Sequence, residues 1–170
     1  MKESIELKEI RSTDPGLLES LSELLTATVN DGASIGFLPP MDSHTALGYW
    51  ESVPAPGVVL LTAWVSDGLA GSVQLHLCTK ENGLHRAEIC KLIVHPAFRR
   101  RGIARALMHA IHGIARDNGR TLLVLDTRKG DPSNALYLSL GYTAAGTIPG
   151  YARSADGRLD ATVLYYRLLG

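Results

Sequence analysis

The junction between an apolar run and a helical pattern constrains this chain more than any other feature. The apolar run ends at Val94, Pro96 follows, and helical spacing begins at Arg99-Arg100-Arg101-Gly102-Ile103-Ala104. The sequence therefore predicts a strand, a short loop and a helix that begins beside three arginines. First-turn amides of a helix lack internal partners, and the helix dipole adds positive charge there. This combination favours a phosphate or pyrophosphate ligand; a solvated basic helix start is the alternative.

The rest of the chain predicts strands and helices in alternation. Apolar runs and alternation predict strands over residues 4–10, 58–65, 71–78, 85–94, 121–125, 142–147 and 162–168. Helical spacing predicts helices over residues 15–29, 42–51, 101–118 and 133–140, with Asp14-Pro15 and Asp131-Pro132 as start signals. The short apolar run 121–125 indicates a strand parallel to its neighbour. We expect one α/β (α+β) domain over residues 1–170, with helices on both faces of a mixed sheet.

Composition argues against several kinds of partner. Lysine plus arginine and aspartate plus glutamate both number 17, so the formal net charge is zero. A neutral chain lacks the basic surface that binds nucleic-acid backbones. Because no apolar run approaches about 18 residues, we expect no membrane span. The polar N-terminus carries no signal-peptide pattern and the two cysteines are far apart, which favours a cytoplasmic location.

The arginine run fits one phosphate-binding pattern and fails two others. A P-loop needs Gly-Lys-Ser/Thr, and a dinucleotide fingerprint needs three spaced glycines; the run has neither. Arg99, Gly102 and Ala104 fit the pattern Arg/Gln-x-x-Gly-x-Gly/Ala, and Leu136-Tyr137-x-x-x-Gly141-Tyr142 follows downstream. Together with the lead-in Leu92-Ile93-Val94-His95-Pro96, these segments resemble the Gcn5-related N-acetyltransferase (GNAT) family over nearly the whole chain.

The resemblance implies a fold, a cosubstrate and a set of binding residues. The implied GNAT fold is a mixed, mostly antiparallel sheet with one parallel, splayed strand pair, in which a β-bulge separates the two strands. The implied cosubstrate is acetyl-coenzyme A. Its pyrophosphate would bind at the arginine run, and its thioester carbonyl would meet a main-chain amide of the preceding strand. The implied cofactor-binding residues are Leu92, Ile93, Val94, Arg99, Arg100, Arg101, Gly102, Ile103 and Ala104. A homodimer is a further expectation from the family.

Direct acetyl transfer to an amine needs a base for the ammonium and an acid for the leaving thiolate. Glu88 is the leading base, because it lies in an apolar run where its carboxylate would be partly desolvated. A salt bridge from Glu88 to Arg86 or Lys91 is the alternative. Tyr137 matches the general acid of the family; a core tyrosine with its hydroxyl at the rim is the alternative.

Asp126 is the second candidate carboxylate. It follows the apolar run 121–125, which would place it at the carboxyl end of a strand, beside the expected cleft. It would share the work of the base or hold the substrate ammonium. The alternative is that its side chain accepts hydrogen bonds from turn amides.

The acceptor pocket is expected in loops that carry Asp31, Ser34, Phe37 and Tyr151, since acidic and aromatic groups suit an ammonium. Segments that include Gly32-Ala33-Ser34-Ile35-Gly36-Phe37 and Pro149-Gly150-Tyr151 resemble the tabtoxin-resistance branch of the family. That likeness implies a small, amino-acid-like amine as acceptor and a detoxifying role. Acetylation of a protein N-terminus or lysine is a rival, and a non-catalytic acyl-coenzyme A sensor is another.

Some residues depart from the pattern or carry less weight. The family's asparagine seven residues before the tyrosine is Gly130 here, and Asn134 is out of register. His109 and His112 lack further metal ligands, so we expect solvated side chains and no metal. Cys78 and Cys90 are interpreted as core thiols on neighbouring strands. An acetyl-cysteine route would need an activating histidine, a role that the sequence gives neither to His76 nor to His85.

Overall fold

The computed structural model describes residues 3–170, and one seven-stranded sheet runs through them. Neighbouring strands are antiparallel except β4 and β5, which are parallel. The predicted mixed sheet with one parallel pair is therefore confirmed. In spatial order the strands are β1 (Glu6–Ile10), β2 (Val58–Val65), β3 (Gly68–Leu77), β4 (Arg86–Val94), β5 (Leu122–Arg128), β7 (Leu159–Leu168) and β6 (Thr143–Arg153).

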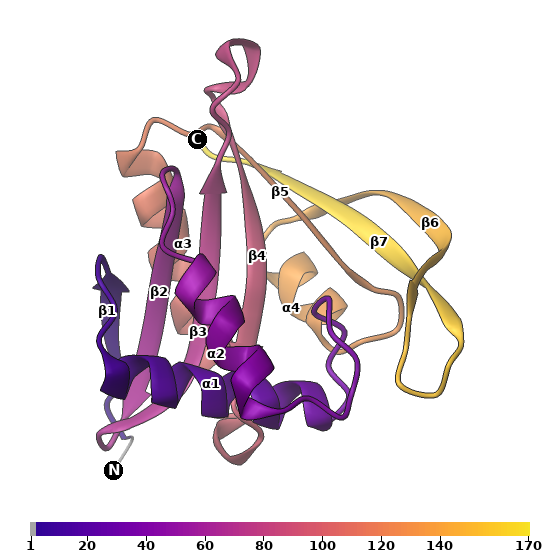
Figure 1. Ribbon diagram of the computed structural model, residues 1–170. Coiled ribbons are helices and arrows are strands. Elements are labelled where there is room, and N and C mark those ends of the chain that lie inside the picture. Colours follow the sequence, from indigo (N-terminus) through magenta and orange to yellow (C-terminus); the bar gives the residue numbers. More distant parts are fainter. Residues whose placement is uncertain (1–2) are drawn as a thin grey trace.

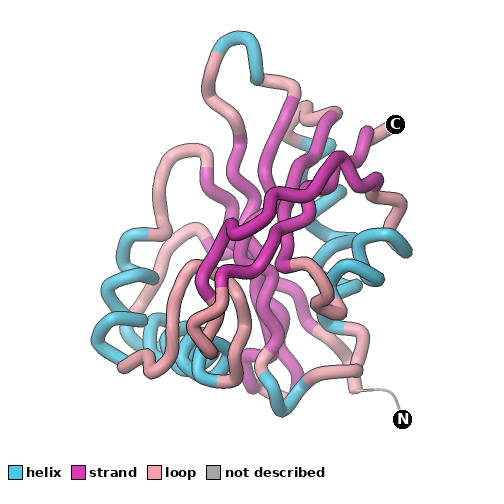
Figure 2. Tube along the Cα trace, turned by 90° about the vertical axis from the view of Figure 1, so that its right-hand side faces the viewer, coloured by secondary structure: helices cyan, strands magenta, loops and turns pink. Residues whose placement is uncertain are grey.

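Four α-helices lie on the two faces of the sheet, as predicted. They are α1 (Pro15–Asn30), α2 (Ser43–Ser52), α3 (Ile103–Asp117) and α4 (Ser133–Ser139), with short 3-10 turns at Glu81–Gly83 and Pro96–Phe98. In Figure 1, α1 and α2 lie in front of the sheet and α3 lies behind it, and Figure 2 shows helices on both sides of the strands. No helix among residues 3–170 has the length and apolarity that a membrane crossing requires.

Each helix layer packs its own apolar core against the sheet. The core under α1 and α2 includes Leu21, Leu25, Trp50, Leu60 and Ile93. The core under α3 and α4 includes Leu75, Leu107, Ile111, Leu123 and Tyr137. Both cores contain buried side chains from the central strands, so the sheet is covered on both faces near its centre.

The predicted caps hold for α1 and fail for α4. The Asp14 carboxylate accepts a hydrogen bond from the Leu17 amide at 2.9 Å and begins α1. Asp131 does not cap α4, whose N-cap residue is Pro132. Instead Asp131 pairs with Nε of Arg128 at 3.0 Å, because a guanidinium is a stronger partner for a carboxylate than a neutral amide is.

The strand β4 carries a β-bulge. Between the pairs Ser72↔Ile93 and Gln74↔Cys90, β3 advances by two residues and β4 by three, and Lys91 has a φ of 51°. Two residues of β4 therefore oppose one of β3, which bends the bulged strand and increases its twist. The parallel pairing with β5 covers only Arg86–Glu88, and the two strands separate beyond it (Figure 1). The predicted bulge and splay are both present.

The last two strands are longer than the sequence predicts. Strand β6 continues through Pro149-Gly150-Tyr151, although proline and glycine indicated a loop there. Its pairing with β7 jumps from Ile148↔Thr162 to Ala152↔Asp160, so the three residues form a bulge. Because β6 is the outermost strand, a proline there removes no hydrogen bond that the sheet needs.

His112 is buried, contrary to the expectation of a solvated side chain. Only 2% of it is exposed, and its Nε2 lies 2.8 Å from Oη of Tyr142. Arg167 donates to its Nδ1 at 2.8 Å, so Nε2 carries the proton of a neutral imidazole. Burial, followed by the charges of Arg167 and Arg116, lowers the pKa of His112 from 6.5 to about 4.

Acid should destabilise the fold through His112. As pH falls, His112 is protonated at about pH 6.5 in the unfolded chain but only at about pH 4 in the folded chain. Acid therefore stabilises the unfolded chain, and the free energy of unfolding falls by about 3 kcal/mol as pH drops from about 6.5 to about 4. Urea unfolding across that range measures the slope. His112→Gln should flatten the slope, whereas His109→Gln, at an exposed position of the same helix, should keep it. A slope that survives His112→Gln would contradict this assignment.

Candidate active site

The beginning of α3 forms a small cradle of main-chain groups. Gly102 is the N-cap residue, its φ is 81°, and a Cβ on it would meet no atom within 4 Å. A glycine adopts this backbone conformation without steric cost. The side chain of Ile103 is buried in the core, so here only its amide is available to a ligand. The first-turn amides of α3 have no intrahelical partners, and the space beside Gly102 is open.

Two of the three arginines before α3 bind carboxylates. Arg99 pairs with Asp31 at 2.5 Å, and Arg101 pairs with Glu3 at 2.8 Å. Asp31, expected in the acceptor pocket, therefore ties the end of α1 to the arginine loop. Arg100 is exposed, and no salt bridge involves it within residues 3–170.

The opening between β4 and β5 has α4 beside it (Figure 1). The main chain of residues 92–94 lies beyond the last pairing of β4 with β5, so this edge of β4 is not used by the sheet. The side chain of Ile93 is buried, and those of Leu92 and Val94 are half-buried. These residues therefore offer main-chain groups, not side chains, to a molecule in the opening.

Glu88 stands at the last paired position of β4 with β5. Its side chain is exposed, which contradicts the expected desolvation. The alternative of a salt bridge fails too: neither Arg86 nor Lys91 forms an ion pair with it in the described chain. The Glu88 carboxylate is thus accessible to a molecule at the point where the two strands separate.

Tyr137 is the buried member of the site. Its ring packs against those of Tyr142 and Tyr165, with centroids 5.8 Å and 5.9 Å away, and only 6% of the residue is exposed. Burial, and then the charge of Asp126, raises the pKa of Tyr137 above its usual range. The phenol therefore keeps its proton. Among residues 3–170 no hydrogen bond occupies Oη, which leaves this hydroxyl available as a donor.

Asp126 lies within β5 and not at its end, because β5 continues to Arg128. Its Oδ2 accepts a hydrogen bond from Oγ1 of Thr162 at 2.7 Å, so the alternative of bonding turn amides is wrong. The side chain is exposed. Its negative charge contributes to the raised pKa of Tyr137 on α4 and to that of Cys90 on β4.

The predicted acceptor residues separate into two groups. Phe37 packs edge-on against Tyr49 with ring centroids 5.2 Å apart, and Nζ of Lys91 lies 5.8 Å from its ring. Ser34 is half-buried in the same loop between α1 and α2. Tyr151 is different: it lies in the bulge of the outermost strand and is 54% exposed.

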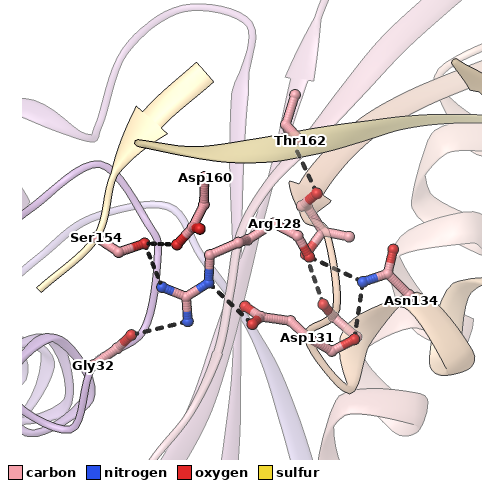
Figure 3. Close-up of polar contacts among 9 residues, drawn as sticks. Gly32, Arg128, Asp131, Asn134, Ser154, Asp160 and Thr162 are labelled. Atoms are coloured by element: carbon pink, nitrogen blue, oxygen red, sulfur yellow. Dashed lines mark hydrogen bonds and ion pairs between the residues drawn. The ribbon is translucent and has the colours of Figure 1, made fainter. Parts of the chain in front are cut away.

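Arg128 organises this side of the molecule, and the sequence did not single it out. Figure 3 shows its guanidinium donating to Asp131 at 3.0 Å, to Oγ of Ser154 at 3.0 Å and to the Gly32 carbonyl at 3.2 Å. Oγ of Ser154 in turn donates to Asp160. One arginine therefore joins the α1–α2 loop, the turn before α4 and the β6–β7 hairpin.

Asn134 does not replace the asparagine that the family pattern expects at Gly130. Its Nδ2 donates to the carbonyls of Arg128 and Asp131 at 3.0 and 2.9 Å (Figure 3). Its Oδ1 accepts from Oη of Tyr165 at 2.8 Å. These partners are protein groups of β5, of the turn before α4 and of β7. The function of Asn134 is therefore to fix the turn that precedes α4.

The remaining chemistry in the site is limited. No three His, Cys, Asp or Glu side chains among residues 3–170 are arranged to hold a metal ion. Burial, followed by the charge of Glu88, raises the pKa of Cys90 to about 12. A thiol that stays protonated is a poor nucleophile, which disfavours an acetyl-cysteine route at this residue.

Comparisons with known proteins agree with this geometry. Residues 20–142 match the model of the acetyltransferase (GNAT) family. The chain belongs to the GNAT family. Acetyl-coenzyme A is the typical cosubstrate of that family, and the open cradle at Gly102, the separated edge of β4 and the unpaired hydroxyl of Tyr137 suit its pyrophosphate, pantetheine arm and sulfur.

Individual GNAT relatives are distant in sequence. An uncharacterised N-acetyltransferase from the hisH–hisA intergenic region of Azospirillum brasilense is 28% identical over 74% of this chain and 76% of its own. The acetyltransferase-like yncA of Salmonella typhimurium, solved with its cofactor acetyl-CoA, is 20% identical, with a TM-score of 0.79 over 98% of this chain and 94% of its own. A ribosomal-protein-alanine N-acetyltransferase of Brucella melitensis is 21% identical, with a TM-score of 0.80 over 95% and 99%.

Gly102→Glu should abolish acetyl-coenzyme A binding, because its carboxylate would enter the anion cradle. Gly119→Glu is the matched control, since Gly119 also has a positive φ and open space, at the other end of α3. Arg100→Ala should weaken binding several-fold at low salt and less at high salt. Calorimetric titration measures all three affinities. Equal affinity of the two glutamate variants would refute the cradle.

Arg128→Lys should destabilise the protein by about 1–3 kcal/mol, because an ammonium cannot serve three acceptors in the plane of a guanidinium. Arg153→Lys is the control, since exposed Arg153 donates one bond, to the Gly157 carbonyl. That change should cost no more than about 0.5 kcal/mol. Urea unfolding compares the two variants, and equal losses would mean that Arg128 does not join the three segments.

Proposed function

We propose that this GNAT enzyme transfers acetyl from acetyl-coenzyme A to the amine of a small, amino-acid-like acceptor by direct attack. The observation that carries the proposal is the set of three groups around the β4–β5 opening: the exposed carboxylate of Glu88, the carboxylate of Asp126 and the protonated hydroxyl of Tyr137. A base and an acid on two sides of one opening are what amine acetylation requires.

Each group has a defined part in the transfer. Glu88 takes the proton of the acceptor ammonium, and Asp126 holds the ammonium through its charge. Main-chain amides of residues 92–94 donate to the thioester oxygen as negative charge develops there. Tyr137 gives its proton to the coenzyme A sulfur as the carbon–sulfur bond breaks, and it regains a proton from solvent. Acetyl-coenzyme A supplies the acetyl group and the leaving thiolate.

The acceptor side favours a small zwitterion. Arg128 joins the α1–α2 loop, which carries Ser34 and Phe37, to the β6–β7 hairpin, which carries Tyr151. Lys91 projects over Phe37 without a carboxylate partner within residues 3–170, so its ammonium is available to an acidic group of the acceptor. Glu88 and Lys91 thus present opposite charges from one strand. Such an acceptor agrees with detoxification of an amino-acid-like toxin.

A second candidate acceptor is a protein N-terminus, since the Brucella melitensis structure is named for acetylation of a ribosomal-protein alanine. At 21% sequence identity, this similarity supports a shared fold but not a shared substrate. The panel of acceptors used below should include peptides with an N-terminal alanine for that reason.

Glu88→Gln and Tyr137→Phe should each lower kcat by about 10²-fold or more, because each removes one proton transfer. Thiol release from acetyl-coenzyme A with a panel of amines and amino acids measures this effect. Tyr137→Phe should keep the thermal stability of the wild type, since Oη bonds no group among residues 3–170. Glu81→Gln, at an exposed position in a 3-10 turn, is the control. Equal rates in every variant would refute these roles of Glu88 and Tyr137, whereas no thiol release with any acceptor would favour a non-catalytic acyl-coenzyme A sensor.

A further inference from the structure

A chain of hydrogen bonds leads from α2 to His76 on β3, which is the cross-strand neighbour of Glu88. Gln74 on β3 is 2% exposed, and its Nε2 donates to Oη of Tyr49 at 2.8 Å. Its Oε1 lies 2.9 Å from Nε2 of His76. Both ends of the Gln74 amide are therefore occupied, and the chain stops at the imidazole of His76.

This chain selects one tautomer of His76. A carbonyl oxygen of an amide can only accept, so the ring nitrogen that faces Oε1 of Gln74 carries a proton. Nε2 of His76 is thus the protonated nitrogen. In the neutral imidazole the other nitrogen, Nδ1, then has a lone pair and can take up a proton.

The register places His76 beside the proposed base. His76 and Glu88 are directly opposite each other in the antiparallel pair β3–β4, which puts their side chains on one face of the sheet. The cross-strand partner of His76 on its other side is Val58, which cannot ionise. The charged groups that act on His76 are therefore Glu88 and Lys91, both from β4. Tyr49 on α2 is linked to His76 only through its hydrogen bond with Gln74.

The imidazole is neutral near pH 7. Burial lowers the pKa of His76 below its usual 6.5, although the charge of Glu88 opposes that effect. A neutral imidazole can accept a proton from a carboxyl group, and the charge of Glu88 favours the imidazolium that results.

We propose that Nδ1 of His76 receives, across one water, the proton that Glu88 takes from the acceptor amine. The N–H bond of the ammonium breaks as the carboxyl O–H forms. That O–H then breaks as the water gains a proton, and another O–H bond of the water breaks as the Nδ1–H forms. The resulting imidazolium keeps its Nε2–H bond to Gln74 and later loses the Nδ1 proton to solvent. Glu88 is then ionised again for the next acceptor. This inference rests on the proposed function.

The His76→Gln enzyme tests this proton relay from Glu88 to His76. His85→Gln is the control, because His85 is exposed. We expect kcat for the acceptor to fall by about 10- to 100-fold, with KM for acetyl-coenzyme A unchanged. In the wild type, activity should fall in acid, at a pH lower than the usual pKa of histidine because burial lowers the pKa of His76, since protonated His76 cannot accept a proton. His76→Gln should lose that decline and His85→Gln should retain it.

A second variant tests the tautomer independently of the first. Gln74→Leu keeps His76 and removes its acceptor, so ¹⁵N NMR of the ring should show Nε2–H dominant in the wild type and a mixture of tautomers in the variant. The relay is wrong if His76→Gln retains wild-type kcat and its acid decline, or if the wild type carries its proton on Nδ1. Should Glu88→Gln be inactive while His76→Gln is normal, the relay alone fails. If no amine is acetylated by the wild type, the proposed function itself fails.

Discussion

One extra residue in β4 is the constraint on which the site depends. The bulge at Lys91 lets β4 stay paired with β3 while it turns away from β5 after Glu88. Without that separation, the main chain of residues 92–94 would be occupied by a neighbouring strand. The same bend leads the chain through Pro96 into the arginine loop and α3. The bulge thus positions the strand edge and the anion cradle together.

The site divides its work between main chain and side chains. In the proposed function, the cosubstrate binds to main-chain groups: the first-turn amides of α3, the open space at Gly102 and the separated edge of β4. The proposed proton transfers use side chains from three different elements, namely Glu88, Asp126 and Tyr137. The proposed acceptor pocket is held together by contacts such as those of Arg128. Substitutions at the acceptor side can therefore change specificity while the bound position of the cosubstrate is preserved.

Local signals in the sequence predicted the frame of the molecule, and long-range contacts determined the rest. The start of α3 and the Asp14 cap follow from interactions over three or four residues, which a sequence displays directly. The pairings of Asp31 with Arg99, Arg128 with Gly32 and His112 with Arg167 join residues 68, 96 and 55 positions apart. Nothing near these residues in the sequence indicates their partners. Tyr151 was predicted to lie in a loop but lies in β6, because an outermost strand tolerates the nearby proline that a central strand would not.

The central claim is that the separated edge of β4 and the start of α3 form one binding surface for acetyl-coenzyme A. Amide hydrogen exchange of the protein with and without acetyl-coenzyme A tests it most directly. The account predicts added protection at residues 92–94 and 102–104 together, with β1 and β2 unchanged. Protection at the start of α3 alone, or protection elsewhere with none in β4, would contradict the claim that the bulge creates the site.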